Sequence, residues 1–261
     1  MVSKDQMRLP TAIIHKLRAH RHTALLIAIV SLFAVRPFLG DTGAGAIVFS
    51  LSILLVLLIA LLTIEIDDLI GERDVLLVQR RRRRLFVWAL AVPAVTERLW
   101  LFYAPTPWLI QIGSISWLLF FVYVTGSQLR SLLKQRAVTS ETISMSMSVY
   151  LLLGLTWGLV YIVIFTRHPE AFSFGSSPGV EEQRMFPVFI YFSLTTLSTI
   201  GYGDITPLSL PARYAAVAEG ITGQFYLAIL VARLVGMQMS QAVTPSAHAP
   251  ADDQLSGPAE R

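Results

Sequence analysis

Long apolar stretches, separated by short and mostly basic segments, dominate the pattern of this chain. A helix of about 20 apolar residues, rising 1.5 Å per residue, crosses the roughly 30 Å hydrocarbon core of a membrane. A further apolar run, residues 186–198, is too short to cross and is predicted to be re-entrant or interfacial. Six stretches are long enough or nearly so, and each is predicted to form a transmembrane helix: residues 23–39, 45–64, 85–103, 108–125, 146–166 and 214–239.

Two of these predicted spans are less typical than the others. Residues 23–39 follow a basic flank, as in a secretory signal, but the flank is long and no small-residue cleavage site follows, so a retained span is predicted. Arg36 lies near the end of that span, and the third span carries Glu97 and Arg98. A lone charge in lipid is costly, so Arg36 and Glu97 are predicted to form a structural pair.

The composition excludes an ordinary soluble domain. Hydrophobic residues make up 54% of the 261 residues and charged residues only 15%, whereas a soluble domain carries about 25% charged residues. The absence of cysteine excludes disulfides, a thiolate nucleophile and thiolate metal sites. We therefore expect an all-α membrane protein with six transmembrane helices and one short re-entrant helix.

The basic residues predict the orientation in the membrane. Six spans put both termini on one side, and that side carries sixteen of the 21 lysines and arginines. The excess predicts that both termini are cytoplasmic, in a plasma membrane or a prokaryotic inner membrane. The densest basic run is interpreted as a topology anchor that could contact anionic lipid, and not as a nucleic-acid site. It consists of Arg80, Arg81, Arg82, Arg83 and Arg84.

The same pattern divides the chain into five segments. Residues 127–135 combine leucines with basic residues and could form an interfacial helix inside a cytoplasmic linker. The last residues are rich in Pro, Ala, Ser and Asp, which is typical of disorder. The segments are a basic cytoplasmic segment (1–22), a four-helix membrane domain (23–126), the linker (127–145), a second membrane domain with the last two spans and the short apolar run (146–240), and a disordered cytoplasmic tail (241–261).

The short apolar run leads into an unusual polar segment. Residues 186–207 read FPVFIYFSLTTLSTIGYGDITP, and Pro187 suits the first turn of a helix. Gly201 and Gly203 then favour backbone conformations that residues with a Cβ avoid. Non-helical backbone at membrane depth is tolerated only where it is buried in protein or lines a water-filled cavity.

Residues 196–204 resemble the signature T-x-x-T-x-G-Y-G-D of the potassium channel family. A pore loop between the fifth and sixth of six spans also resembles that family, and the resemblance implies that residues 146–240 are a pore domain. The resemblance implies a homotetramer around a central four-fold pore, in which carbonyl groups replace the water around K⁺. It implies a selectivity filter of Thr199, Ile200, Gly201, Tyr202 and Gly203, with K⁺ held by the carbonyls of the first four and the Thr199 hydroxyl.

The resemblance also implies residues that support the filter. Tyr191 and Phe192 occupy positions where the family places aromatic side chains behind the filter, and Thr196 and Asp204 flank it. The family often has two tryptophans where this chain has Tyr-Phe. Because Phe192 cannot donate a hydrogen bond to Asp204, the bracing of the filter is expected to differ from the usual pattern.

The last span holds the candidates for gating and for the cavity wall: Glu219, Gly220, Gly223 and Gln224. Gly223 could be a hinge or a packing residue, since small residues permit close helix contact in membranes. Glu219 is an ionisable group within a span, which makes it a functional candidate. The sequence leaves open whether it braces the pore helix, has a partner elsewhere or is exposed at the interface.

The predicted fourth span contains no arginine between residues 108 and 126. Voltage sensing requires several arginines that move through the membrane field. An arginine-based voltage sensor is therefore not expected.

The leading hypothesis is a potassium-selective channel that conducts K⁺ passively and needs no cofactor. The alternative is a weakly selective cation channel gated by lipid, pH or tension. A transporter built from pore loops would need four related loops, and one is present. An enzyme is not expected, because the five histidines lie outside the spans and no catalytic constellation is visible.

Overall fold

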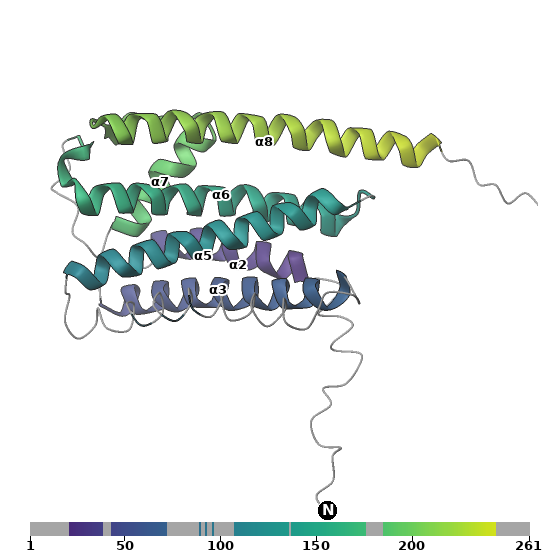
Figure 1. Ribbon diagram of the computed structural model, residues 1–261, viewed down its shortest axis with the longest axis horizontal. Helices are drawn as coiled ribbons and strands as arrows, with labels where there is room; N and C mark the ends of the chain where they lie inside the picture. The colour runs from purple at the N-terminus through teal and green to yellow at the C-terminus, as the bar shows by residue number, and fades with distance from the viewer. Residues whose placement is uncertain are drawn as a thin grey trace, which may run out of the picture.

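A computed structural model describes residues 21–38, 43–71, 107–135, 137–175 and 185–243, together with residues 89, 92 and 96. Within these residues the fold is almost entirely helical (Figure 1). The elements are α2 (Arg21–Val35), η1 (Arg36–Phe38), α3 (Gly43–Gly71), α5 (Pro107–Lys134), α6 (Ser140–Arg167), η2 (Pro169–Ala171), β1 (Phe172–Ser173), α7 (Met185–Leu197), β2 (Thr206–Pro207) and α8 (Leu210–Val243).

Helix α6 lies at the centre of the bundle. It contacts α2, α5, α7 and α8, whereas α2 and α3 pack on each other at the far side of the bundle from α8 (Figure 1). The short helix α7 lies obliquely between α6 and α8 (Figure 1). The pore-loop region is therefore held against the rest of the chain mainly through α6.

Three helices in the described part of the chain are long and apolar enough to cross a membrane: Gln111–Lys134, Ser140–Arg167 and Leu210–Met239. They coincide with three of the predicted spans. Helix α2 and the apolar part of α3, Leu51–Thr63, are shorter, and α7 is too short to cross, as predicted. The predicted span at 85–103 lies mostly outside the described residues.

Several other sequence predictions also fall outside the described residues. They are the basic segment up to residue 20, the run Arg80–Arg84, the charges Glu97 and Arg98, and the tail from residue 244. The expected topology, the lipid contact and the disordered tail therefore stay predictions. Within the described part, Arg36 places its guanidinium over the ring of Phe49, 5.4 Å from the centroid.

The first predicted span is longer than the helix that forms. Helix α2 ends at Val35, four residues before the expected boundary, because Pro37 disfavours helical backbone at the residue before it. The helix also begins at Arg21, inside the segment assigned to the cytoplasm. Its start is fixed by Glu141 of α6, which accepts hydrogen bonds from the His22 N–H (3.2 Å) and the Thr23 hydroxyl (2.6 Å).

Most of the predicted cytoplasmic linker at 127–145 is helical. Helix α5 continues to Lys134 and α6 begins at Ser140, so the expected interfacial helix at 127–135 is the last part of α5. No glycine or proline interrupts residues 127–145, and nothing local stops the helix where its apolar stretch ends. The Thr139 hydroxyl caps α6 by accepting the N–H of Thr142 (3.2 Å).

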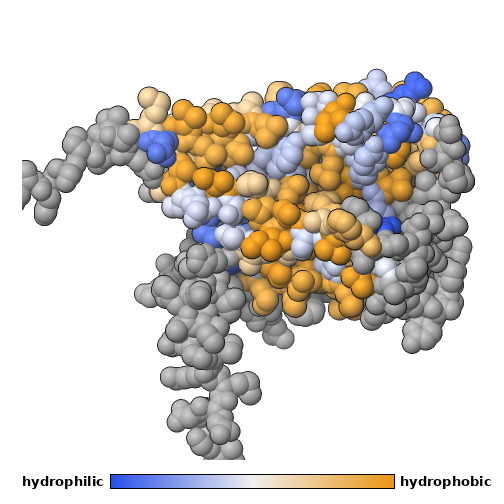
Figure 2. Space-filling model, turned by 180° about the vertical axis from the view of Figure 1, so that it is seen from behind, coloured by the Kyte–Doolittle hydropathy of each residue, from blue (hydrophilic) through white to orange (hydrophobic). Residues whose placement is uncertain are grey.

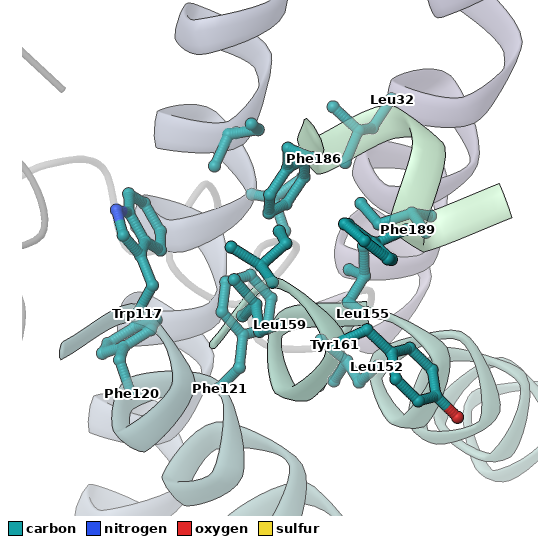
Figure 3. Close-up of a cluster of buried hydrophobic side chains, with 14 of the residues drawn as sticks. Leu32, Trp117, Phe120, Phe121, Leu152, Leu155, Leu159, Tyr161, Phe186 and Phe189 are labelled. Atoms are coloured by element: carbon teal, nitrogen blue, oxygen red, sulfur yellow. The ribbon is translucent and has the colours of Figure 1, made fainter. Parts of the chain in front are cut away.

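An aromatic-rich core joins α7 to the rest of the bundle (Figure 3). Phe186, near the start of α7, meets Phe49 of α3 edge-on with ring centroids 5.8 Å apart. One turn later, Phe189 packs against Phe165 of α6 and Phe172 of β1. This continuous packing sets the position of α7, and hence of the segment that follows it.

Helix α8 is the least covered helix of the bundle. Apolar side chains on it are well exposed in the single chain, among them Tyr214, Phe225, Ile229 and Met239. Figure 2 shows apolar residues over much of the described surface. Apolar surface of this extent requires lipid or another protein surface against it.

Candidate functional site

The site begins where α7 ends. Helix α7 starts at Met185, which places Pro187 in its first turn as predicted, and its last helical residue is Leu197. The Thr196 hydroxyl donates to the carbonyl of Phe192 (2.8 Å), within the last turn of the helix. From Ser198 to Asp204 the backbone leaves the helix and every residue is exposed in the single chain.

Three successive N–H groups after α7 point back at its last turn. The N–H of Thr199 donates to the Thr196 carbonyl (3.0 Å). The N–H groups of Ile200 and Gly201 both donate to the Thr195 carbonyl (2.8 and 3.1 Å). Within the described residues, no hydrogen bond ends on the carbonyls of residues 199–203. These carbonyls are therefore available to a ligand.

The backbone of this segment alternates in handedness. Positive φ values occur at every second residue: Thr199 (61°), Gly201 (53°) and Gly203 (81°). Such alternation turns successive N–H groups to one side and successive carbonyls to the other. The two glycines were predicted to need this conformation, but Thr199 was not, and a β-branched residue with positive φ is a strained outlier of the kind found at functional sites.

The predicted filter residues are thus contiguous and lie at the surface of the chain. Ile200 is 56% exposed and Tyr202 70% exposed. An apolar and an aromatic side chain with this exposure lie where another surface can cover them.

The end of the segment at Asp204 is held by a hydrogen bond from Tyr191. The Tyr191 hydroxyl donates to Asp204 Oδ2 (2.8 Å), and the Tyr191 ring stacks on Tyr202 with centroids 6.3 Å apart and planes 2° apart. The hydrogen bond to Asp204 raises the pKa of Tyr191 above its ordinary value, with smaller effects of burial and of the Asp204 charge. The tyrosine therefore remains a neutral donor.

Phe192 lies on the other side of α7 and does not face Asp204. Its ring meets Tyr161 of α6 with centroids 4.9 Å apart and Phe172 of β1 at 5.8 Å. Phe192 therefore packs α7 against α6 and β1, within the aromatic core. The expected pair of bracing residues is thus divided between two tasks, since successive residues of a helix point about 100° apart.

A strap of two short strands holds the chain after the segment. β1 and β2 pair antiparallel, with Phe172 opposite Pro207 and Ser173 opposite Thr206. The Leu208 N–H also donates to the Ala171 carbonyl (2.8 Å). These contacts hold residues 206–208, which follow the exposed segment, against residues 171–173, which follow α6.

Gly223 lies where α8 touches the end of α7. A Cβ atom there would lie 2.6 Å from the Leu197 carbonyl oxygen. Of the two interpretations that the sequence leaves open, the structure supports the packing residue, and α8 continues through position 223 without interruption. A Cβ on Gly220 would meet nothing within 4 Å, and Gln224 is exposed in the single chain.

Glu219 is fully buried and braces α7 against α6. The Tyr161 hydroxyl of α6 hydrogen bonds to its Oε2, and the Ser193 hydroxyl of α7 to its Oε1. The sequence analysis missed Tyr161 and Ser193. The available signal was a hydroxyl residue within each apolar stretch, since a polar group placed there needs a partner.

Arg233 of α8 was also missed, because it was counted only as a cytoplasmic charge. Its Nη2 donates to the carbonyls of Leu133 (2.5 Å) and Gln135 (2.8 Å). The last carbonyls of a helix have no partners within the helix, so Arg233 satisfies the end of α5. This contact joins the second half of α8 to the preceding helices.

Residues 149–239 match a family model described as an ion channel. The match begins in α6 and covers α7, the exposed segment and most of α8. This part of the chain is thus similar to an ion channel domain, and the described residues include three helices that are long and apolar enough to cross a membrane. The prediction of an ion channel domain is borne out for these residues, and the match points to a protein that is not an enzyme.

Two curated relatives are similar to the pore region. Protein LctB of Bacillus caldotenax is 30% identical over 93 residues, which are 33% of this chain and 64% of that protein. Protein LctB of Geobacillus stearothermophilus is 31% identical over 82 residues, 31% of this chain and 60% of that protein. The chain thus spans less than two thirds of the length of these relatives. No solved structure matches the chain.

Proposed function

We propose that four copies of this chain form a potassium-selective channel, with residues 199–203 of each copy lining a central pore. The observation that carries the proposal is the alternating backbone of Thr199, Gly201 and Gly203. Together with the three N–H groups bonded to α7, it leaves a row of carbonyls directed away from the supporting helix.

A dehydrated cation needs such a row of oxygen ligands in place of its water. Carbonyl oxygens of Thr199, Ile200, Gly201 and Tyr202, with the Thr199 hydroxyl, would replace the water around K⁺. One chain supplies only one side of each ring, which agrees with the exposure of the segment in the single chain. The partly negative C-terminal end of α7 favours a cation close to it.

Assembly as a homotetramer also accounts for the exposed apolar side chains of α8. In the proposed channel this helix faces the pore and the neighbouring subunits, and α2, α3 and α5 face lipid. We place the channel in the plasma membrane or a prokaryotic inner membrane, with both termini cytoplasmic, as the distribution of basic residues favours. The proposal requires no cofactor, and K⁺ is the permeant ion.

Gating in this proposal does not use a row of arginines in α5. The first basic residue of α5 is Arg130, close to the end of the helix. We propose that lipid, pH or tension acts on the outer helices and that the contact between Arg233 and the end of α5 transmits the effect to α8.

The test is the reversal potential of purified full-length protein in planar bilayers under a K⁺/Na⁺ bi-ionic gradient. We expect a reversal close to the potassium equilibrium potential, and loss of that selectivity in Gly201→Ala and Gly203→Ala, where a Cβ opposes a positive φ. Gly236→Ala is the matched control, because a Cβ there meets nothing within 4 Å. Currents that reverse near zero would instead support the weakly selective cation channel.

A further inference from the structure

Three helices of the pore region meet at one buried polar junction. Tyr161 of α6, Ser193 of α7 and Glu219 of α8 are each fully buried. In Figure 3 the Tyr161 hydroxyl lies at the edge of the aromatic core and points away from it. A carboxyl group therefore lies in the packed interior, and its hydrogen bonds can be counted atom by atom.

The junction contains three contacts between oxygen atoms at hydrogen-bond distance. Glu219 Oε2 contacts the Tyr161 hydroxyl, and Glu219 Oε1 contacts the Ser193 hydroxyl. Ser193 Oγ also lies 2.7 Å from the carbonyl oxygen of Gly154. Each such contact needs one proton between its oxygens, so the junction needs three protons.

The neutral groups of the junction supply only two of these protons. Tyr161 and Ser193 carry one hydroxyl proton each, and the Gly154 carbonyl carries none. If Ser193 donates to Gly154, its oxygen can only accept from Glu219, and an ionised carboxylate has no proton to donate. A protonated Glu219 carboxyl supplies the third proton that the junction needs.

The surroundings of Glu219 also favour the neutral acid. The ring of Tyr161 packs against Phe192 and Phe172, so the junction lies beside apolar side chains. The titratable groups that face Glu219 are Tyr161 and Tyr150 of α6, while α7 contributes the Ser193 hydroxyl. Among the described residues, no cationic group acts on Glu219. An unpaired charge in such a site is costly, and protonation removes that cost.

We infer that Glu219 is a protonated, neutral carboxylic acid, and that it is a positioning residue for the pore helix. Its O–H donates to Ser193, Ser193 donates to the Gly154 carbonyl, and Tyr161 donates to the other carboxyl oxygen. This relay fixes α7 to both α6 and α8. Two residues after Ser193, the Thr195 carbonyl accepts the N–H groups of Ile200 and Gly201. The consequence for ion selection rests on the proposed function, whereas the protonation state does not.

Infrared spectroscopy of the purified full-length protein near neutral pH tests the inference without any measurement of conduction. We expect the C=O band of a protonated carboxyl in the wild type and its loss in Glu219→Gln. Glu170→Gln is the matched control, because Glu170 is 79% exposed and its removal should leave that band in place. If Glu219→Gln instead removes only carboxylate bands, Glu219 is ionised and the inference is overturned.

A second variant tests the relay and remains informative if Glu219→Gln does not fold. Ser193→Ala removes the acceptor of the carboxyl proton, so the protonated C=O band should move to higher frequency. A band at the same position in Ser193→Ala would contradict donation from Glu219 to Ser193. Because neither readout depends on current, a non-selective or silent channel would count against the proposed function alone.

Discussion

A Cβ atom on Gly223 would lie 2.6 Å from the carbonyl oxygen of Leu197. The inner surface of α8 therefore reaches the end of α7 through a position that has no side chain. The same Cβ would also lie 2.9 Å from a methyl group of Leu197. Both atoms belong to the residue that ends α7, just before the exposed segment.

Gly223→Ala is expected to destabilise the protein by about 1–3 kcal/mol, because the added methyl overpacks a backbone contact that cannot move freely. The comparison variant is Gly220→Ala, one turn earlier, where a Cβ meets nothing within 4 Å. Helix propensity favours alanine by about 1 kcal/mol, so Gly220→Ala should be neutral or stabilising. Thermal unfolding in detergent, followed by tryptophan fluorescence, measures both. Equal stability of the two variants would contradict the packing role of Gly223.

Tyr191→Phe should weaken the support of the proposed filter while leaving the ring stack with Tyr202 intact. The variant loses one hydrogen bond to a carboxylate, worth about 1 kcal/mol at this exposed position. We expect currents in planar bilayers that decay faster after opening, with an unchanged reversal potential. Tyr214→Phe is the control, because it removes a tyrosine hydroxyl at another exposed position, on α8. Wild-type decay in Tyr191→Phe would show that the bond does not hold the filter.

The contribution of Tyr191 to stability should depend on pH in one direction. Its pKa is raised in the folded protein because the neutral phenol donates to Asp204. The bond therefore stabilises the fold fully below the ordinary tyrosine pKa of about 10, and this stabilisation is lost as the pH rises through the higher, folded-state value. The difference in melting temperature between wild type and Tyr191→Phe should be constant up to about pH 10 and shrink above it. A difference that already shrinks near neutral pH would contradict this assignment.

Arg233→Gln should loosen the second half of α8 from the end of α5. The variant loses the charge-assisted bonds to the Leu133 and Gln135 carbonyls, which at this partly exposed site contribute about 1 kcal/mol. The chain has no cysteine, so Lys134→Cys and Gln238→Cys provide unique sites for spin labels. We expect a broader distribution of distances between the labels in Arg233→Gln. Arg130→Gln, at an exposed position of α5, should leave it unchanged. An equally narrow distribution in both variants would exclude Arg233 as the link.

The part of the site that could be predicted is the part that local chemistry determines. Pro187 marks the first turn of α7, and two glycines one residue apart require a backbone that other residues avoid. The positive φ of Thr199 could not be predicted, because threonine disfavours it and only the surrounding hydrogen bonds impose it. The partners of Glu219 were equally hidden, since Tyr161 and Ser193 lie 58 and 26 residues away along the chain.

The fold shows the same difference between features that local sequence determines and features that it does not. Apolar length located α5, α6 and α8, but the helix ends were misplaced wherever a helix continues beyond its apolar stretch. Residues 127–134 include several polar and charged residues and are still good enough helix formers to prolong α5. Helix α2 showed the opposite error, because Pro37 ends the helix inside an apolar run.

The prolonged α5 has a mechanical consequence. The connection from α5 to α6 is Gln135–Thr139, and because a chain segment spans at most about 3.6 Å per residue, it limits how far the two helix ends can separate. Midway along, the hydroxyls of Thr125 and Thr156 are 3.0 Å apart and join the same pair of helices. Arg233 adds α8 to this pair at the end of α5. A tilt of α5 is therefore transmitted directly to both α6 and α8, the two helices that pack against α7.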